Sequence, residues 1–239
     1  MKITQTPSPN FDARTLPISL LILHYTGMES GEAALARMCD ADAKVSAHYM
    51  VETDGRIFQL VDEENRAWHA GVSEWAGETN INSASIGIEI VNGGHNVPLE
   101  DGSLPPYPDV QINAVIALSK AVMARHGSLT LLGHSDIAPE RKDDPGEHFP
   151  WAGLAAAGLG AYPSVEDDRR ILFTAGERDR GVSILQSGLA HIGYGARVTG
   201  IMDARTTAIV TALQRRYRQD QVDGVVDVMT MEIVKALVS

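Results

Sequence analysis

Two short and nearly continuous apolar runs, residues 20–23 and 86–91, constrain the fold of this chain most strongly. A run of this kind is typical of a buried strand, and of a sheet that is covered on both faces. An apolar face with helical periodicity predicts a long helix over 109–126, and a further strand is expected over 128–132. Because strands alternate with helices, we expect an α/β fold with a central sheet flanked by helices.

Other local signals complete this core. Residues 48–51 and 57–61 flank an Asp-Gly pair, which is a strong signal for a β-hairpin. Residues 29–39 have the composition of a helix, with Ser30 as a candidate N-cap. Residues 95–108 and 135–150 are rich in proline or charge, and we expect loops there.

The C-terminal third of the chain has a different pattern. Small residues at 155–164 are followed by a charged stretch, which predicts a linker. We therefore expect a larger domain over 1–163, a linker over 164–175 and a small helical domain over 176–239. Three helices are expected, at about 182–191, 204–218 and 231–238, and Asp203 and Thr230 stand where N-caps belong.

Composition limits the possible partners and compartments. Lys and Arg number 20 against 31 Asp and Glu, and the net charge of −11 argues against nucleic acid as a partner. The single cysteine, Cys39, excludes an internal disulfide. No apolar stretch approaches the ~20 residues of a membrane-spanning helix. Met1 opens no recognisable signal peptide, so the sequence predicts a cytoplasmic protein.

Three polar residues stand at expected strand ends or in the loops beside them: His24, His134 and Asp144. Two histidines and one carboxylate form a recurrent catalytic zinc set that leaves a fourth position open for water. The alternative is that these histidines are structural or solvated. Composition does not distinguish Asp143 from Asp144, and the helical zinc-protease motif HExxH is absent.

Glu89 interrupts the apolar run 86–91, and a buried carboxylate is costly unless it is paired or bound to a metal. The alternative is that Glu89 faces solvent on a strand that is covered on one side only. Lys142 would place a cation near the same site, or else it is an exposed loop lysine.

Five segments together resemble a known family, the zinc-dependent N-acetylmuramoyl-L-alanine amidases of the AmpD/AmiD type (Amidase_2), which share their fold with peptidoglycan-recognition proteins. The segments are LILHYTG (21–27), VSAHYMVETDGRIFQLV (45–61), RAWHAGVS (66–73), SIGIEIVN (85–92) and GHSDIAPERKDDPG (133–146). The resemblance implies a mixed central sheet flanked by helices. It also implies a substrate amide bond between N-acetylmuramic acid, or its 1,6-anhydro form, and L-alanine.

The resemblance also assigns roles to residues. It implies that His24, His134 and Asp144 bind one zinc ion per chain, and the pattern Lys-x-Asp-Pro-Gly selects Asp144 over Asp143. It places Glu89 as the catalytic glutamate and Lys142 as the catalytic lysine. We further expect the substrate to be contacted by Trp68, His69 and Asn82. The phage enzymes of this fold carry a tyrosine where Ala47 stands, so proton transfer is expected to fall to Glu89.

The C-terminal segments 185–195, 200–217 and 222–237 resemble the three-helix peptidoglycan-binding domain of type 1. The resemblance implies peptidoglycan or muropeptides as partners, and cell-wall contact makes the envelope the alternative compartment. A helical bundle that only packs on the catalytic domain is the other interpretation of these helices. For the whole chain, the alternatives are a non-catalytic recognition protein and a zinc hydrolase of another amide. The sequence predicts no oligomeric state.

Overall fold

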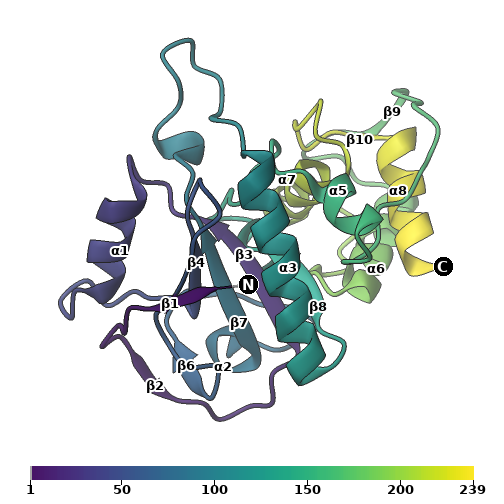
Figure 1. The fold of residues 1–239 in the computed structure, drawn as a ribbon. Helices are drawn as coiled ribbons and strands as arrows, with labels where there is room; N and C mark the ends of the chain where they lie inside the picture. Colours follow the sequence, from purple (N-terminus) through teal and green to yellow (C-terminus); the bar gives the residue numbers. More distant parts are fainter. Residues whose placement is uncertain (1) are drawn as a thin grey trace.

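The computed structural model describes residues 2–239, and its centre is a six-stranded mixed sheet (Figure 1). The strands lie in the order β1-β5-β4-β7-β3-β8. Their bounds are β1 Ile3–Gln5, β3 Leu20–Tyr25, β4 Tyr49–Val51, β5 Ile57–Gln59, β7 Ser85–Ile90 and β8 Thr130–Gly133. β3 pairs in parallel with β7 and β8, whereas β4 and β5 form the expected antiparallel hairpin. The predicted mixed α/β fold is therefore confirmed.

The two faces of the sheet differ in composition. Helix α3 (Asp109–His126) covers one face, where alternate residues of β3 and β7 join its apolar side in one core: Leu21, Leu23, Ile86, Ile88 and Ile90. Since successive strand residues point to opposite faces, His24 and Glu89 lie on the other face. They are direct neighbours in the register of β3 and β7.

Short elements surround the sheet. α1 (Gly31–Cys39) begins after Ser30, whose hydroxyl accepts the Ala33 N–H as expected. β2 (Phe11–Ala13) and β6 (Asn65–Ala67) form a separate antiparallel pair. The other short elements are α2 (Ile81–Ala84), the 3-10 helix Gly94–Asn96 and α5 (Trp151–Ala156).

The expectation of a continuous loop over 135–150 is wrong at its start. A short helix, α4 (His134–Ile137), directly follows β8. The side chain of Asp136 accepts the Gly133 N–H at 2.8 Å, which stabilises the turn from strand into helix. As a result His134 occupies the first position of a helix that is completely buried.

The C-terminal part contains the three expected helices, α6 (Arg180–Ile192), α7 (Ala204–Tyr217) and α8 (Val228–Val238), beside a small pair of strands, β9 (Ile171–Phe173) and β10 (Val226–Asp227). Asp203 caps α7 as predicted. The prediction that Thr230 caps α8 is wrong, because α8 begins three residues earlier. Asp227 is the cap, and its carboxylate accepts both the N–H and the hydroxyl of Thr230.

The C-terminal helices pack directly on the rest of the molecule, beside the β8 side of the sheet (Figure 1). One hydrophobic core joins Ile22, Trp75 and Leu132 to apolar residues of α6, α7 and α8. The Trp75 and Tyr194 rings meet edge to face with centroids 4.9 Å apart. This packing favours the interpretation in which the helices cover an apolar face of the N-terminal part. The domain boundaries at 163 and 176 stay a prediction.

Within residues 2–239, no helix combines the length and the apolar character that crossing a bilayer would require.

Candidate metal centre

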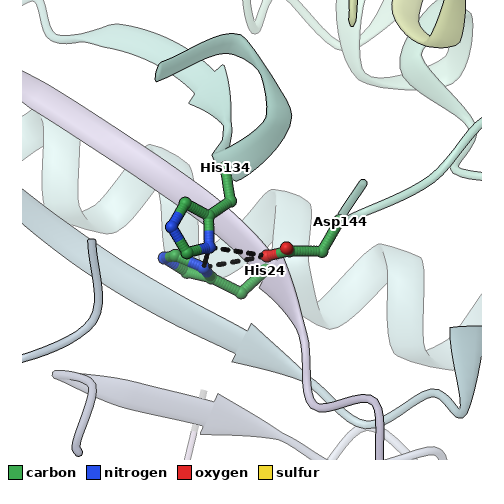
Figure 2. A group of neighbouring side chains, drawn as sticks. All are labelled: His24, His134 and Asp144. Atoms are coloured by element: carbon green, nitrogen blue, oxygen red, sulfur yellow. Dashed lines mark hydrogen bonds and ion pairs between the residues drawn. The ribbon is translucent and has the colours of Figure 1, made fainter. Parts of the chain in front are cut away.

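The structure brings His24, His134 and Asp144 together, although 120 residues separate the first from the last (Figure 2). His24 lies near the end of β3, His134 begins α4, and Asp144 lies in the loop that follows α4. All three side chains are buried. We call these three residues the ligand set.

The contacting atoms of the ligand set form a nearly equilateral triangle. His24 Nδ1 lies 2.9 Å from His134 Nδ1, and each nitrogen lies 3.0 Å from Asp144 Oδ2. Figure 2 shows both imidazole rings and the carboxylate pointing at the same spot. Which of these atoms carries a proton follows from the hydrogen bonds on the far side of each ring.

For His134 this assignment is direct. Its other ring nitrogen, Nε2, lies 3.0 Å from the carbonyl oxygen of Ala70, which can only accept a hydrogen bond. Nε2 therefore carries the proton and donates it to Ala70. A neutral His134 then presents a bare lone pair at Nδ1, toward the centre of the ligand set.

For His24 the assignment runs through a chain of hydrogen bonds. The Ser85 hydroxyl donates to the carbonyl of Ile81 at 2.6 Å, so its oxygen accepts from His69 Nε2 at 3.2 Å. His69 Nδ1 is then an acceptor, and His24 Nε2 donates to it at 3.0 Å. His24, like His134, presents a bare lone pair at Nδ1.

Burial and neighbouring groups also shift the pKa values of the site. Burial, reinforced by the His134 charge, lowers the pKa of His24 to about 4, so its imidazole is neutral at pH 7. Burial opposes ionisation of Asp144, but the two neighbouring histidines outweigh it, and the pKa of Asp144 lies below its usual value. With the ring protons directed to Ala70 and His69, the ligand set presents three acceptors to one another. A cation at the centre stabilises such a set, and two nitrogens with one carboxylate oxygen suit zinc.

Glu89 lies beside the ligand set, at the register position of His24 on the neighbouring strand. Its Oε2 is buried and has no hydrogen-bond partner among residues 2–239. Burial, together with the Asp144 charge, raises the pKa of Glu89 well above its usual value, and the Lys142 charge opposes this rise. Glu89 also lines a hollow of about 310 Å³ with Met28, Arg37 and other residues. A buried carboxyl group with a raised pKa is a candidate for accepting and returning protons.

The remaining predicted residues have different surroundings. Lys142 is half-buried, and its charge acts on both His24 and Glu89. Trp68 is half-buried as well, and its indole Nε1 has no hydrogen-bond partner in the described part of the chain. Both residues therefore retain a group that a ligand could engage.

His69 and Asn82, which were expected to contact substrate, are engaged within the protein. His69 is buried, and its two ring nitrogens face His24 and Ser85. The Asn82 side-chain oxygen accepts the N–H groups of His69 and Ala70 at 3.0 and 2.7 Å. Asn82 thereby holds the segment whose ring and carbonyl fix the protons of both ligand histidines. These contacts favour a positioning role for His69 and Asn82 over direct substrate contact.

Sequence reasoning missed Ser85 and Gly87, which lie on the same face of β7 as Glu89. A Cβ atom at Gly87 would stand 2.6 Å from the ring of His69, so only glycine leaves room for that ring. The alternation Ser85-x-Gly87-x-Glu89 was the available signal, because period 2 places these residues on one face.

Comparison with known proteins gives independent evidence about this chain. The sequence profile of the Amidase_2 family, N-acetylmuramoyl-L-alanine amidase, matches residues 14–147, and the profile of a peptidoglycan binding domain matches residues 178–234. The N-acetylmuramoyl-L-alanine amidase AmiD of Escherichia coli is 36% identical over 232 residues, which are 92% of this chain and 82% of that protein.

Other relatives match less of the chain. The 1,6-anhydro-N-acetylmuramyl-L-alanine amidase AmpD of Haemophilus influenzae is 34% identical over 62% of this chain and 87% of its own length. Among solved structures, the complex of E. coli AmiD with anhydro-N-acetylmuramic acid-L-Ala-D-gamma-Glu-L-Lys has a TM-score of 0.78. It is 32% identical and covers 95% of this chain and 91% of that one. The chain therefore belongs to the Amidase_2 family of N-acetylmuramoyl-L-alanine amidases.

Proposed function

We propose that this chain uses one zinc ion to hydrolyse the amide bond between the lactyl carbonyl of N-acetylmuramic acid, or of its 1,6-anhydro form, and L-alanine. The observation that carries the proposal is the ligand set, in which two imidazole nitrogens and one carboxylate oxygen lie 2.9–3.0 Å from one another. Family membership supports the choice of substrate.

Zinc at this site would be held by Nδ1 of His24, Nδ1 of His134 and the Asp144 carboxylate. When bound there, zinc supplies Lewis-acid activation of a water molecule and of the scissile carbonyl. The contribution of the protein is to orient the two histidine rings. His69 and the Ala70 carbonyl hold the two rings with their lone pairs inward, before any metal arrives.

We assign proton transfer to Glu89. Its carboxylate takes a proton from the attacking water, and the carboxyl group then returns it to the nitrogen of the leaving L-alanine. The new C–O bond yields the muramic carboxylic acid as the C–N bond breaks and releases the peptide amine. The raised pKa of Glu89 suits both halves of this transfer.

Lys142 and Trp68 complete the assignment. We assign to the Lys142 ammonium group the stabilisation of negative charge that develops on the carbonyl oxygen, a role typically worth ~3–4 kcal/mol. The half-buried Trp68 offers an indole N–H and an apolar ring to the substrate.

We also propose that residues 176–239 bind peptidoglycan, on the basis of the profile match at 178–234. A sacculus pull-down with the full chain, run with and without competing soluble muropeptide, tests this. The compartment stays a prediction, the cytoplasm with the envelope as its alternative, and cell fractionation separates the two.

The test of the proposed reaction is product analysis. Anhydro and ordinary muramyl peptides are incubated with zinc-loaded protein, and the products are identified by mass spectrometry. We expect free peptides that begin with L-alanine, together with the peptide-free sugar. Cleavage only within the peptide, or no cleavage by zinc-loaded protein, would contradict the proposal.

A further inference from the structure

The end of α7 contacts two segments, one that carries His134 and one that carries Asp144. We propose that the C-terminal helical domain positions His134 and Asp144 through Tyr194, Arg215 and Arg216, and so forms part of the metal centre's support. The inference rests on the proposed zinc site, and its test separates the two.

The first contact is made through Asp136, which is 1% exposed and lies two residues after His134. Its Oδ2 accepts from the Gly133 N–H at 2.8 Å and from Arg216 Nη1 at 3.0 Å. Its Oδ1 accepts from the Tyr194 hydroxyl at 2.7 Å. We call Asp136, Tyr194 and Arg216 the Asp136 cluster. Because Gly133 and Asp136 lie on either side of His134, this cluster fixes the backbone that carries His134.

The donors of the Asp136 cluster are themselves held in place. Arg216 is 7% exposed, also donates to the carbonyl of Leu131 in β8 at 3.0 Å, and lies 4.3 Å above the Trp151 ring. The Tyr194 ring packs on Trp75. These contacts leave Arg216 and Tyr194 little freedom to follow Asp136 if it moves.

The second contact is made to the loop that carries Asp144. Arg215, the neighbour of Arg216, pairs with the Asp143 carboxylate at 2.6 Å. Gln219, just beyond α7, donates to the carbonyls of Glu147 and Phe149. The C-terminal domain therefore holds the Asp144 loop on both sides of the ligand.

Two ligands of one ion are thus placed by one helix end, whereas His24 is placed by the sheet. Loss of these contacts should let the distances within the ligand set vary more. It should leave the hollow that Glu89 lines unchanged. The expected signature is weaker zinc binding and a lower kcat, with KM for a soluble muropeptide unchanged. Loss of outer-shell partners typically weakens metal affinity or activity by ~10–100-fold.

The chain offers a matched control in Arg218. Like Arg216 it is a buried arginine near the end of α7, but the carboxylates with which it pairs, Asp223 and Asp227, lie in its own domain. Arg218→Met should destabilise the helical domain and leave the zinc affinity of the folded protein unchanged. Arg216→Met, which keeps an apolar stem over Trp151, should weaken zinc binding by ~10–100-fold.

The experiment is a zinc titration against a competing chelator on the full chain, with unfolding and steady-state kinetics measured in parallel. Tyr194→Phe and Arg215→Gln are milder variants and decide the outcome if Arg216→Met does not fold. Native zinc affinity and kcat in these folded variants, with only the unfolding midpoint lowered, would overturn the inference while the zinc proposal stands. Absence of zinc binding in the unmodified chain would overturn the zinc proposal itself, and this inference with it.

Discussion

Two buried polar clusters each include one residue of α4: the ligand set includes His134, and the Asp136 cluster includes Asp136. They differ in whether each acceptor has a hydrogen-bond donor. In the Asp136 cluster, one carboxylate accepts hydrogen bonds from a guanidinium, a phenol and a backbone N–H. In the ligand set, one carboxylate faces two imidazole lone pairs, and the protons of both rings are used elsewhere. The two clusters are nearly equal in burial, so burial alone does not separate them.

The difference shows what distinguishes a structural cluster from a site. Buried polar groups are normally satisfied by partners, and the Asp136 cluster follows that rule. In the ligand set, three acceptors face one another with no donor between them. A bound cation would satisfy all three. The predictions below test this contrast, beginning with the largest expected effect.

Glu89 shares the side of the sheet that carries the ligand set but is not a member of it. Glu89→Gln should retain zinc and lower kcat by ~10²–10⁴-fold, because the amide cannot carry a proton between water and the leaving amine. Steady-state kinetics with parallel metal analysis measures both quantities. If the variant turns over at the native rate, Glu89 is not the proton carrier.

Asp136 and Arg216 should contribute to the free energy of unfolding as an ion pair. Asp136→Ala strands the buried Arg216 charge and should lower the free energy of unfolding by ~3–5 kcal/mol. The double variant Asp136→Leu/Arg216→Met leaves no buried charge and should recover most of that loss. Denaturant unfolding of the metal-free proteins compares them. Equal losses in the single and double variants would mean that the charges do not act as a pair.

Buried neutral histidines should make the region around the ligand set sensitive to acid. Burial, reinforced by the Arg14 charge, lowers the pKa of His48 to about 3, and the usual value is regained on unfolding. The unfolded chain therefore binds more protons below about pH 6.5, and stability falls as the pH falls. Between pH 7 and pH 5 this histidine alone should cost about 2 kcal/mol of unfolding free energy. His48→Gln should flatten the profile, and an unchanged slope would contradict the assignment.

The smallest effect on zinc affinity should come from Ser85, at the end of the hydrogen-bond chain that runs through His69 to His24. Ser85→Ala removes the acceptor that keeps the His69 proton on Nε2, so His69 can offer a proton to His24 instead of accepting one. Zinc affinity should fall by roughly 10-fold, near the lower end for outer-shell partners. Ser119→Ala is the control, because Ser119 is a buried serine of α3 whose hydroxyl has no partner among residues 2–239. Equal zinc affinities in the two variants would contradict the chain of hydrogen bonds.

The sequence predicted the ligand set but not the groups that orient it. The apolar runs at 20–23 and 86–91 define β3 and β7, and with them the positions of His24 and Glu89. The helix over 109–126 matches α3 residue for residue. These features are local, since strand and helix periodicity are visible within one segment.

The features that sequence reasoning missed are long-range. His69 meets His24 across 45 residues, and Arg216 meets Asp136 across 80, and neither pairing leaves a periodic signal. The start of α8 was misplaced because Asp227 and Thr230 both have side chains that cap helices. The packing of the C-terminal helices on Trp75 is long-range as well, and composition does not show it.

The most direct test of the central claim is metal titration of the ligand set. Metal-free protein is titrated with zinc against a chelator, and activity on a muramyl peptide is followed in the same samples. We expect one zinc per chain and activity that rises in proportion to bound zinc. In Asp144→Asn, whose amide can donate to an imidazole lone pair, zinc binding and activity should disappear while the metal-free protein gains about 1 kcal/mol of stability. Full activity in metal-free protein, or native zinc affinity in Asp144→Asn, would contradict the account.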